Sequence, residues 1–351
     1  MPSISRAVPL TLILLAGSAL AQSNSPAAAA TPGPYRVAQT FQIGGEGGWD
    51  LLAVDAEHKL LYVPRSTHTQ VIGADDGKVI AEIPGQQRNH GVALVPDVGR
   101  GFITDGKDAS IVVFDLKTHE VLGKVKADDD ADDAVYDPAS KKVLVACGDP
   151  GKMLMLTADA DPKSAKVESI DLGGKPEAIA ADEKGKAYVN LQDKNVVAVV
   201  DTRSGKVIDR WPVAPGGSPV GMAIDAEHRR LFIGCRDPQK LVVMSCDDGK
   251  VIADLPIGAG VDAGAFDPTG GGYAFASCRD GTLAVAHETS PGKFEIVQTV
   301  QTRSGARTMC LDPATHKLYL PTAQFEPAAP GQRRPAAKPN SFMIVVVEPS
   351  K

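Results

Sequence analysis

Residues 54–63, VDAEHKLLYV, and residues 224–233, IDAEHRRLFI, match almost residue for residue although they lie far apart in the chain. Each stretch combines an apolar run ending in Asp, a polar turn and a second apolar run. The same unit recurs as VYDPASKKVLV, AADEKGKAYV, AFDPTGGGYAF, CLDPATHKLYL and, more loosely, ALVPDVGRGFIT. Two short apolar runs around a polar turn predict a pair of β-strands. The repetition of this pair decides the fold.

One anchor residue marks each unit, at the end of its first apolar run. The seven anchors are Asp55, Val95, Asp137, Asp182, Asp225, Asp267 and Asp312. Successive anchors are about 40 to 45 residues apart, which is the period of propeller blades. A second pair of Val- and Ile-rich runs joined by D-G or S-G turns follows each first pair. Each unit is therefore predicted to be a blade of four antiparallel strands, and no segment shows sustained helical periodicity.

The two ends of the chain predict how the ring of blades closes. The seventh unit supplies strands only near residues 306–312, 316–321 and 341–347. Residues 35–44, YRVAQTFQIG, resemble the fourth strand of other units, as in KVIADLPIG. Pairing the two ends would leave no large exposed edge. We expect an all-β fold: a seven-bladed β-propeller over residues 35–351, closed by an N-terminal strand that completes the last blade.

The first residues have the pattern of an export signal. Residues 1–21 carry one Arg, an apolar run and the small-residue end Ala19-Leu20-Ala21, which is typical of a signal peptide and too short for a membrane span. Residues 22–34 are a low-complexity linker. We therefore predict a periplasmic or secreted protein, cleaved near Ala21. An odd number of cysteines, five, argues against a fully paired disulfide framework, and no C-x-x-C-H motif indicates covalent haem.

The net charge of the chain indicates which classes of partner it can bind. The chain has 37 Lys and Arg against 43 Asp and Glu, a net charge of −6. An acidic protein repels nucleic acid, so nucleic-acid binding is the least favoured function class. The expected partner is a small polar ligand or a protein in the cell envelope.

The units resemble the YVTN-type propeller repeats of exported YncE-like bacterial proteins. YVNL (188–191), FITD (102–105) and LYVP (61–64) approach the motif, and VVDTRSGKV (199–207) matches the V-x-D…T-x-G-K-V pattern. Gly73 and Ser245 depart from it, because the pattern has Asp at those positions. The resemblance implies a periplasmic or secreted propeller. It implies no single chemistry, since propellers serve as enzymes, binding modules and scaffolds.

A set of polar residues recurs five positions before the anchors, where the innermost strands begin. We call these positions the ring; they are Asp50, His90, Asp132, Glu177, Val220, Asp262 and Arg307. Strand starts are often polar for local reasons. Six ionisable residues at one register of a propeller nevertheless predict a charged site at the mouth of the channel. Trp49 is a candidate stacking surface or a core aromatic, and Arg65 ends a second strand on the same face. Arg307 could hold a ligand anion or pair with Asp262.

Several chemistries fit the ring. Asp50, Asp132, Glu177 and Asp262 could bind a hard divalent cation, and His90 would favour a transition metal. His90 with a carboxylate could act as acid and base in a lactonase-like hydrolase or a lyase, although no nucleophile or metallohydrolase motif is present. Binding of a small polar ligand, metal ion or peptide needs the fewest assumptions. A protein-interaction scaffold, in which the ring only rigidifies the channel, is a further alternative.

Two other features have simpler interpretations. Cys147, Cys235 and Cys278 end the second strands of three blades, and we interpret them as core residues rather than soft-metal ligands. The Pro-rich basic stretch 324–341 is an insertion in blade seven, either a lid over the channel or, preferably, a solvated loop.

Overall fold

The computed structural model describes residues 1–2, 33–327 and 335–350 of the chain. The chain divides into two units, residues 1–32 and 33–351, and the fold below is that of the second unit. Nearly all of the predicted signal peptide and linker lies outside the described residues, so these assignments stay predictions. Among the described residues, no helix is long and apolar enough to cross a bilayer.

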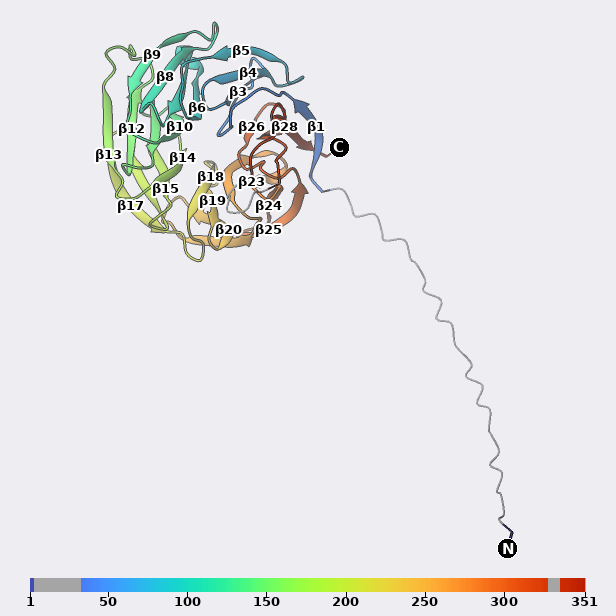
Figure 1. Ribbon diagram of the computed structural model, residues 1–351. Coiled ribbons are helices and arrows are strands. Elements are labelled where there is room, and N and C mark those ends of the chain that lie inside the picture. Colours follow the sequence, from blue (N-terminus) through green and yellow to red (C-terminus); the bar gives the residue numbers. More distant parts are fainter. Residues whose placement is uncertain (3–32, 328–334, 351) are drawn as a thin grey trace. The chain divides into compact units, whose positions relative to one another are not determined.

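Seven four-stranded antiparallel sheets form a ring, as the sequence predicts (Figure 1). In Figure 1, the first strands of the blades, among them β6, β10, β14 and β18, lie around the centre, and the last strands, such as β5, β9, β13 and β17, lie at the periphery. Within the described residues, the helical content is two short 3₁₀ turns, Pro96–Val98 and Thr269–Gly271. The all-β seven-bladed propeller fold is therefore confirmed.

The strand bounds follow the sequence repeat. Blades one and two consist of β2 (Ala53–Asp55), β3 (Leu60–Pro64), β4 (Thr69–Gly73), β5 (Val79–Ile83), β6 (Asn89–Val95), β7 (Arg100–Asp105), β8 (Ser110–Asp115) and β9 (Val121–Lys126). Blades three and four consist of β10 (Ala131–Asp137), β11 (Lys142–Cys147), β12 (Lys152–Thr157), β13 (Val167–Asp171), β14 (Pro176–Ala181), β15 (Lys186–Leu191), β16 (Val196–Asp201) and β17 (Lys206–Pro212). Blades five and six consist of β18 (Pro219–Asp225), β19 (Arg230–Arg236), β20 (Gln239–Ser245), β21 (Val251–Pro256), β22 (Val261–Asp267), β23 (Tyr273–Cys278), β24 (Thr282–Ser290) and β25 (Lys293–Gln301).

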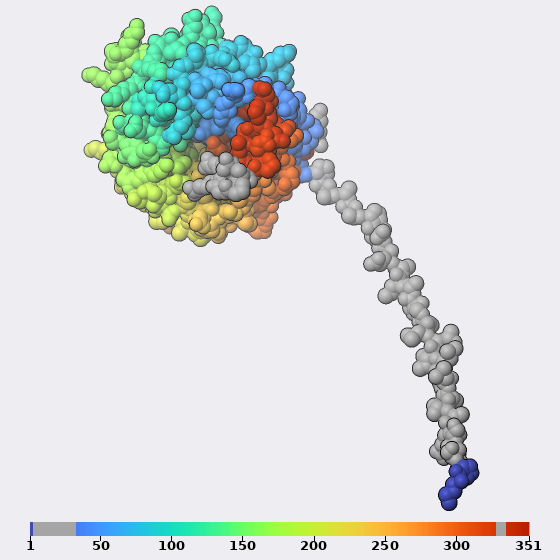
Figure 2. All heavy atoms as spheres, in the orientation of Figure 1, coloured from blue at the N-terminus to red at the C-terminus, as the bar shows by residue number. Residues whose placement is uncertain are grey.

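Blade seven joins the two ends of the propeller, and in Figure 2 its red C-terminal residues lie beside the blue residues of the first strands. It consists of β26 (Cys310–Asp312), β27 (Lys317–Thr322), β28 (Met343–Pro349) and β1 (Tyr35–Gln42). β1 pairs antiparallel with β28, from Tyr35 opposite Pro349 to Gln42 opposite Met343. The N-terminal strand thus supplies the fourth strand of the last blade, as predicted, and the backbone edge of β28 is satisfied.

The anchor aspartates explain why the repeat is visible in the sequence. All six are buried, and each accepts a hydrogen bond from a backbone N–H two to four residues further on. An Asp at this position therefore fixes the turn between the first two strands. Blade two has Val95 instead, and its turn is a 3₁₀ turn that ends at Gly99 in the left-handed region, with φ of 65°. Glycine adopts that conformation without strain.

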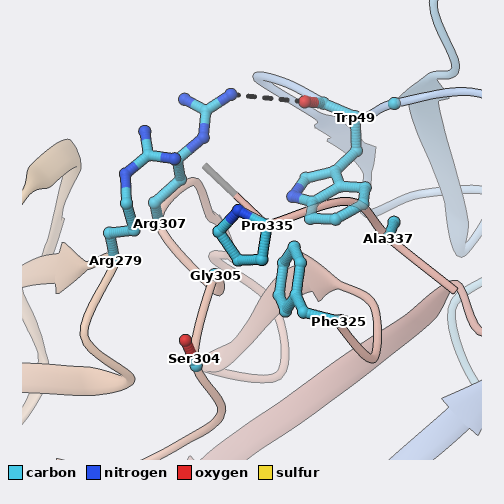
Figure 3. Close-up of a pocket in the computed structure, with 9 residues that line it drawn as sticks. Trp49, Arg279, Ser304, Gly305, Arg307, Phe325, Pro335 and Ala337 are labelled. Atoms are coloured by element: carbon cyan, nitrogen blue, oxygen red, sulfur yellow. Dashed lines mark hydrogen bonds between the residues drawn. The ribbon is translucent and has the colours of Figure 1, made fainter. Parts of the chain in front are cut away.

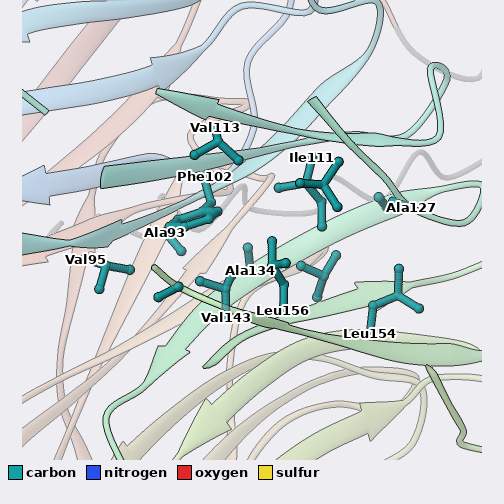
Figure 4. Close-up of a cluster of buried hydrophobic side chains, with 14 of the residues drawn as sticks. Ala93, Val95, Phe102, Ile111, Val113, Ala127, Ala134, Val143, Leu154 and Leu156 are labelled. Carbon is teal, nitrogen blue, oxygen red and sulfur yellow. The ribbon is translucent and has the colours of Figure 1, made fainter. Parts of the chain in front are cut away.

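The cores lie between neighbouring blades. Figure 4 shows the cluster between blades two and three, in which Phe102 and Ile111 pack with Val143 and Leu154. Burying each such side chain contributes roughly 1.5–3 kcal/mol. Cys147, Cys235 and Cys278 are fully buried free thiols, and each belongs to such an apolar cluster. They are core residues, in agreement with the preferred interpretation.

Candidate functional site

The ring residues line one cavity of about 360 Å³. Its lining includes the side chains of all seven ring positions, although these come from seven different blades. Other described residues of the lining are Leu51, Arg88, Asp133, Ala178, Arg236 and Arg279. The repeat register therefore located the cavity lining correctly. We call this space the central cavity.

β-bulges turn the ring residues toward the central cavity. In five blades, the pairing of the first two strands shifts register at the ring position: between Asn89 and Val92, Ala131 and Ala134, Pro176 and Ile179, Pro219 and Met222, and Val261 and Ala263. A bulge adds a residue to one strand and re-aims the local side chains. In blades one and seven the first strand is short, and Asp50 and Arg307 precede it.

Polar side chains of one blade hold the backbone of the ring residue in the next. The Thr104 hydroxyl donates to the carbonyl of Asp132, and the Ser277 hydroxyl donates to the carbonyl of Arg307 at 2.5 Å. The Asn190 amide donates to the carbonyl of Val220 at 3.0 Å. Thr104, Asn190 and Ser277 occupy the same position of their second strands and are fully buried. Because these bonds cross between blades, they fix the ring residues relative to one another.

Blades six, seven and one pair their ring charges. The Asp262 carboxylate forms ion pairs with both Arg307 and Arg236, and its side chain is 8% exposed. A second guanidinium nitrogen of Arg307 lies 3.3 Å from Asp50 Oδ1. Of the two roles considered for Arg307 from the sequence, the ion pair with Asp262 is present in the structure. We call Asp262, Arg236, Arg307 and Asp50 the paired half of the ring.

Blades three and four form an acidic half, made of Asp132, Asp133 and Glu177. Burial raises the pKa of Asp132 to about 7, and the charge of Asp50 adds to this effect while His90 opposes it. Burial also raises the pKa of Glu177 to about 7 against the opposing charge of Lys175. The pKa of Asp133 is raised to about 6 by burial, although its carboxylate accepts the Ile179 N–H at 2.8 Å. Crowded carboxylates with raised pKa values are a physical mark of a binding site.

His90 joins the two halves. Its Nδ1 lies 2.7 Å from Asp50 Oδ2 and 3.6 Å from Asp132 Oδ1. Burial lowers the pKa of His90, but the hydrogen bond to Asp50 and the charge of Asp132 outweigh burial, so the net shift is upward. Its Nε2 is buried and has no hydrogen-bond partner among the described residues. This nitrogen lies against Gly106, because a Cβ atom at that glycine would be only 3.2 Å from it. The imidazole therefore presents only Nδ1 to the carboxylates.

The candidate metal ligands are only partly brought together. Ligand atoms of Asp50, His90 and Asp132 lie within 4.8 Å of one another. Glu177 and Asp262 do not join this group, and Asp262 is already neutralised by two arginines. The four-carboxylate set predicted for a hard cation is therefore corrected, because its members belong to electrostatically different halves. A donor set of one imidazole and two carboxylates suits a transition metal better than Ca²⁺.

Arg65 does not line the central cavity, which corrects its predicted role in ligand binding. It is fully buried, and its guanidinium donates to the carbonyls of Gly48, Gly44 and Glu46 and to Gln70. It also lies 3.7 Å from the centre of the Phe342 ring. Arg65 thus holds the loop that presents Trp49 and Asp50, as a positioning residue.

Trp49 lies next to the central cavity rather than in it. Its indole packs against Phe325 and Phe342, with ring centres 6.1 and 5.7 Å away. It lines a second cavity, which shares Arg279 and Arg307 with the central one (Figure 3).

Four charged residues of the central cavity were missed by counting along the repeat. Asp133 follows a ring residue on the same bulge, and Arg88 precedes another by two positions. Arg236 ends β19 and Arg279 directly follows β23, so both lie at one register of the repeat, one position beyond that of Arg65. The missed signal was therefore a second register, which supplies two guanidinium groups from the ends of second strands.

Comparison with known proteins supports the fold alone. No family model matches the chain, and no curated protein sequence matches it. Among solved structures, the chain is similar to the β-propeller domain of Myceliophteria thermophila Cps50 (Swd1), with a TM-score of 0.67 and 12% sequence identity. The similarity covers 90% of this chain and 99% of that one. At this identity the likeness concerns architecture, and the ring must be interpreted from its own chemistry.

Proposed function

We propose that the protein is a YncE-like binding protein of the cell envelope, which holds a small polar ligand with an ammonium group in the central cavity. The observation that carries this proposal is the acidic half. Asp132, Asp133 and Glu177 line a cavity of about 360 Å³, and burial, with the charges of neighbouring carboxylates, raises their pKa values. A ligand ammonium would compensate these carboxylates as they ionise.

Glu177 is the residue best placed to contact the ammonium. Its carboxylate makes no hydrogen bond or ion pair with a described residue, whereas the Asp133 carboxylate is held by a backbone N–H. The arginines that line the same cavity could receive a carboxylate of the same ligand, which makes zwitterions such as amino acids suitable members of the class.

The test compares amines with neutral molecules of the same shape. Melting temperature and calorimetric titration at pH 8 would be measured with amino acids, ethanolamine and diamines, and with the corresponding diols. We expect saturable stabilisation by at least one amine and none by its diol. Glu177→Gln should weaken binding about tenfold, whereas Glu183→Gln, at an exposed turn of the same blade, should not. Equal responses to amines and diols would contradict the proposal.

A divalent transition metal is a second candidate ligand, favoured by the 4.8 Å grouping of Asp50, His90 and Asp132. Elemental analysis of the purified protein and titration with Mn²⁺ and Zn²⁺ test it. Binding should be lost in His90→Gln and kept in His68→Gln. No change in melting temperature with any of these ions would remove this candidate.

An acid–base hydrolase or lyase is less well supported. Nδ1 of His90 is engaged by Asp50, and the buried Nε2 has no access to a substrate in the cavity. An interaction scaffold predicts that no amine or metal changes the melting temperature.

The cellular location rests on residues 1–21 alone. It is tested by N-terminal sequencing of the protein from the producing cell. We expect the mature chain to begin near Gln22, and an uncleaved Met1 would contradict export.

A further inference from the structure

The second cavity has a volume of about 320 Å³ and differs from the central one in its walls. It is lined by Trp49, Phe325, Pro335 and Ala337 on one side and by Arg279, Arg307 and the Ser304-Gly305 turn on the other; Gly48 completes the lining. In Figure 3 the rings of Trp49 and Phe325 lie close together, and the Arg279 and Arg307 side chains lie beside each other. We call it the tryptophan cavity.

The charge of this lining has one sign. Both ionisable groups among its described residues are guanidiniums, whereas the central cavity combines arginines with five carboxylates. Arg307 already contacts Asp262, Asp50 and the Trp49 carbonyl, so it contributes a partly neutralised positive charge to this lining. A planar anion fits a pair of neighbouring guanidiniums better than a cation would.

The apolar wall is held in place from several directions. Phe325 bridges to Ala337, the Glu326 N–H donates to the Ala336 carbonyl at 2.8 Å, and the Lys338 N–H donates to the Gln324 carbonyl at 2.7 Å. The Phe325 ring also covers Gly305, whose φ is +83° and where a Cβ would lie 2.5 Å from the ring. The two described arms of the 324–341 insertion thus form a fixed wall.

One polar group of this wall lacks a partner. The indole nitrogen of Trp49 is buried without a hydrogen-bond acceptor among the described residues. Figure 3 shows this nitrogen on the edge of the ring nearest Pro335. A buried donor without an acceptor is costly, and an acceptor oxygen brought by a ligand would relieve that cost.

We propose that the tryptophan cavity binds a small aromatic carboxylate. The aromatic ring lies against Trp49 and Phe325, and the carboxylate faces Arg279 and Arg307. Offset or edge contacts between aromatic rings favour such a ring over an aliphatic body, and the volume is that of a small-molecule site. The proposal does not rest on the ammonium site, because the aromatic wall belongs to the tryptophan cavity, although Arg279 and Arg307 line both cavities.

Phenylacetate is a suitable probe because it has the ring and the carboxylate but lacks the ammonium proposed to bind in the central cavity. Phenylacetamide removes its charge, and acetate removes its ring. Calorimetric titration should show saturable binding of phenylacetate, and at least about tenfold weaker binding of either control. Phenylacetamide binding as tightly as phenylacetate would overturn the proposal.

Fluorescence locates the probe, since the chain has two tryptophans. Trp211 is buried in the core of blades four and five. In Trp211→Phe, phenylacetate should change the remaining emission with the same affinity as calorimetry gives. Binding by calorimetry without any change in Trp49 emission would place the probe elsewhere and overturn the proposal.

Charge variants complete the test. Arg279→Gln should weaken phenylacetate binding about tenfold, whereas Arg203→Gln, an exposed residue of blade four, changes the net charge equally and should have no effect. Unchanged affinity in Arg279→Gln would contradict the assignment. If Arg279→Gln does not fold, the salt dependence of wild-type affinity replaces it: affinity should fall as salt screens the guanidiniums, and an affinity independent of salt would contradict the proposal.

Discussion

The paired half and the acidic half line one cavity but hold their carboxylates in opposite electrostatic states. In the paired half, the Asp262 carboxylate pairs with the guanidiniums of Arg236 and Arg307. The Asp50 carboxylate lies 3.3 Å from the guanidinium of Arg307. In the acidic half, Asp132, Asp133 and Glu177 crowd one another and have raised pKa values. The difference teaches that a paired carboxylate stabilises the ring, whereas an unpaired one costs stability that a ligand can return.

The largest expected effect comes from the support of the paired half. Arg65→Met removes a buried guanidinium that ties four loop carbonyls and Gln70 to Phe342. We expect the free energy of unfolding in urea to fall by about 3–5 kcal/mol, because buried acceptors lose their donors. Arg203→Met is the exposed control. A loss below about 1 kcal/mol would mean that the loop does not depend on Arg65.

Within the paired half, Asp262→Asn should lower the free energy of unfolding by about 2–4 kcal/mol, since Arg236 and Arg307 lose their shared anion. Asp254→Asn breaks the more exposed pair with Lys240 and should cost less than about 1 kcal/mol. Urea denaturation at pH 7 compares the two. Equal losses would show that the paired half is no more stabilising than a surface ion pair.

The acidic half should make stability fall as pH rises. Asp132, Asp133 and Glu177 have folded-state pKa values above their unfolded ones, so the folded protein binds more protons between about pH 5 and 7. The raised pKa of His90 acts in the same direction. We expect the free energy of unfolding to be about 1–3 kcal/mol higher at pH 5.5 than at pH 8. A rise in stability over the same interval would contradict the crowding of these carboxylates.

The smallest effect isolates one member of the acidic half. At pH 8, Glu177→Gln should raise the free energy of unfolding by about 1 kcal/mol, because it removes a charge that burial disfavours. The same variant should flatten the dependence on pH, whereas Glu183→Gln should leave it unchanged. Destabilisation by Glu177→Gln would mean that Glu177 is a structural partner rather than a free ligand group.

The fold could be predicted from the sequence because the blades use the same residue types at the same structural positions. The anchor aspartates cap their own turns, so six of seven repeats show the same letter at the same place. Ring closure was equally readable, since β1 retains the pattern of a fourth strand.

The site was only partly readable, because pairing depends on neighbours in space. Counting five residues back located the ring, but it could not tell that Asp262 meets Arg236 at the end of β19 or that Asp133 shares a bulge with Asp132. Arg65 directly follows β3 and Arg236 ends β19, one repeat position further along, yet Arg65 is fully buried under a Gly-rich loop whereas Arg236 lines the central cavity. Local loop composition decides between these outcomes.

The shared last blade makes the site a property of the finished chain. Asp50 follows β1 and Arg307 precedes β26, so both stand at the junction that closes only when β28 pairs with β1. During synthesis, residues 35–42 cannot pair until residues 343–349 have been made. Before that pairing forms, the two sides of this junction are not held in register. A ligand that contacts both sides would bind the closed ring preferentially and so stabilise it. Its binding would distinguish complete molecules from those whose last strand is missing.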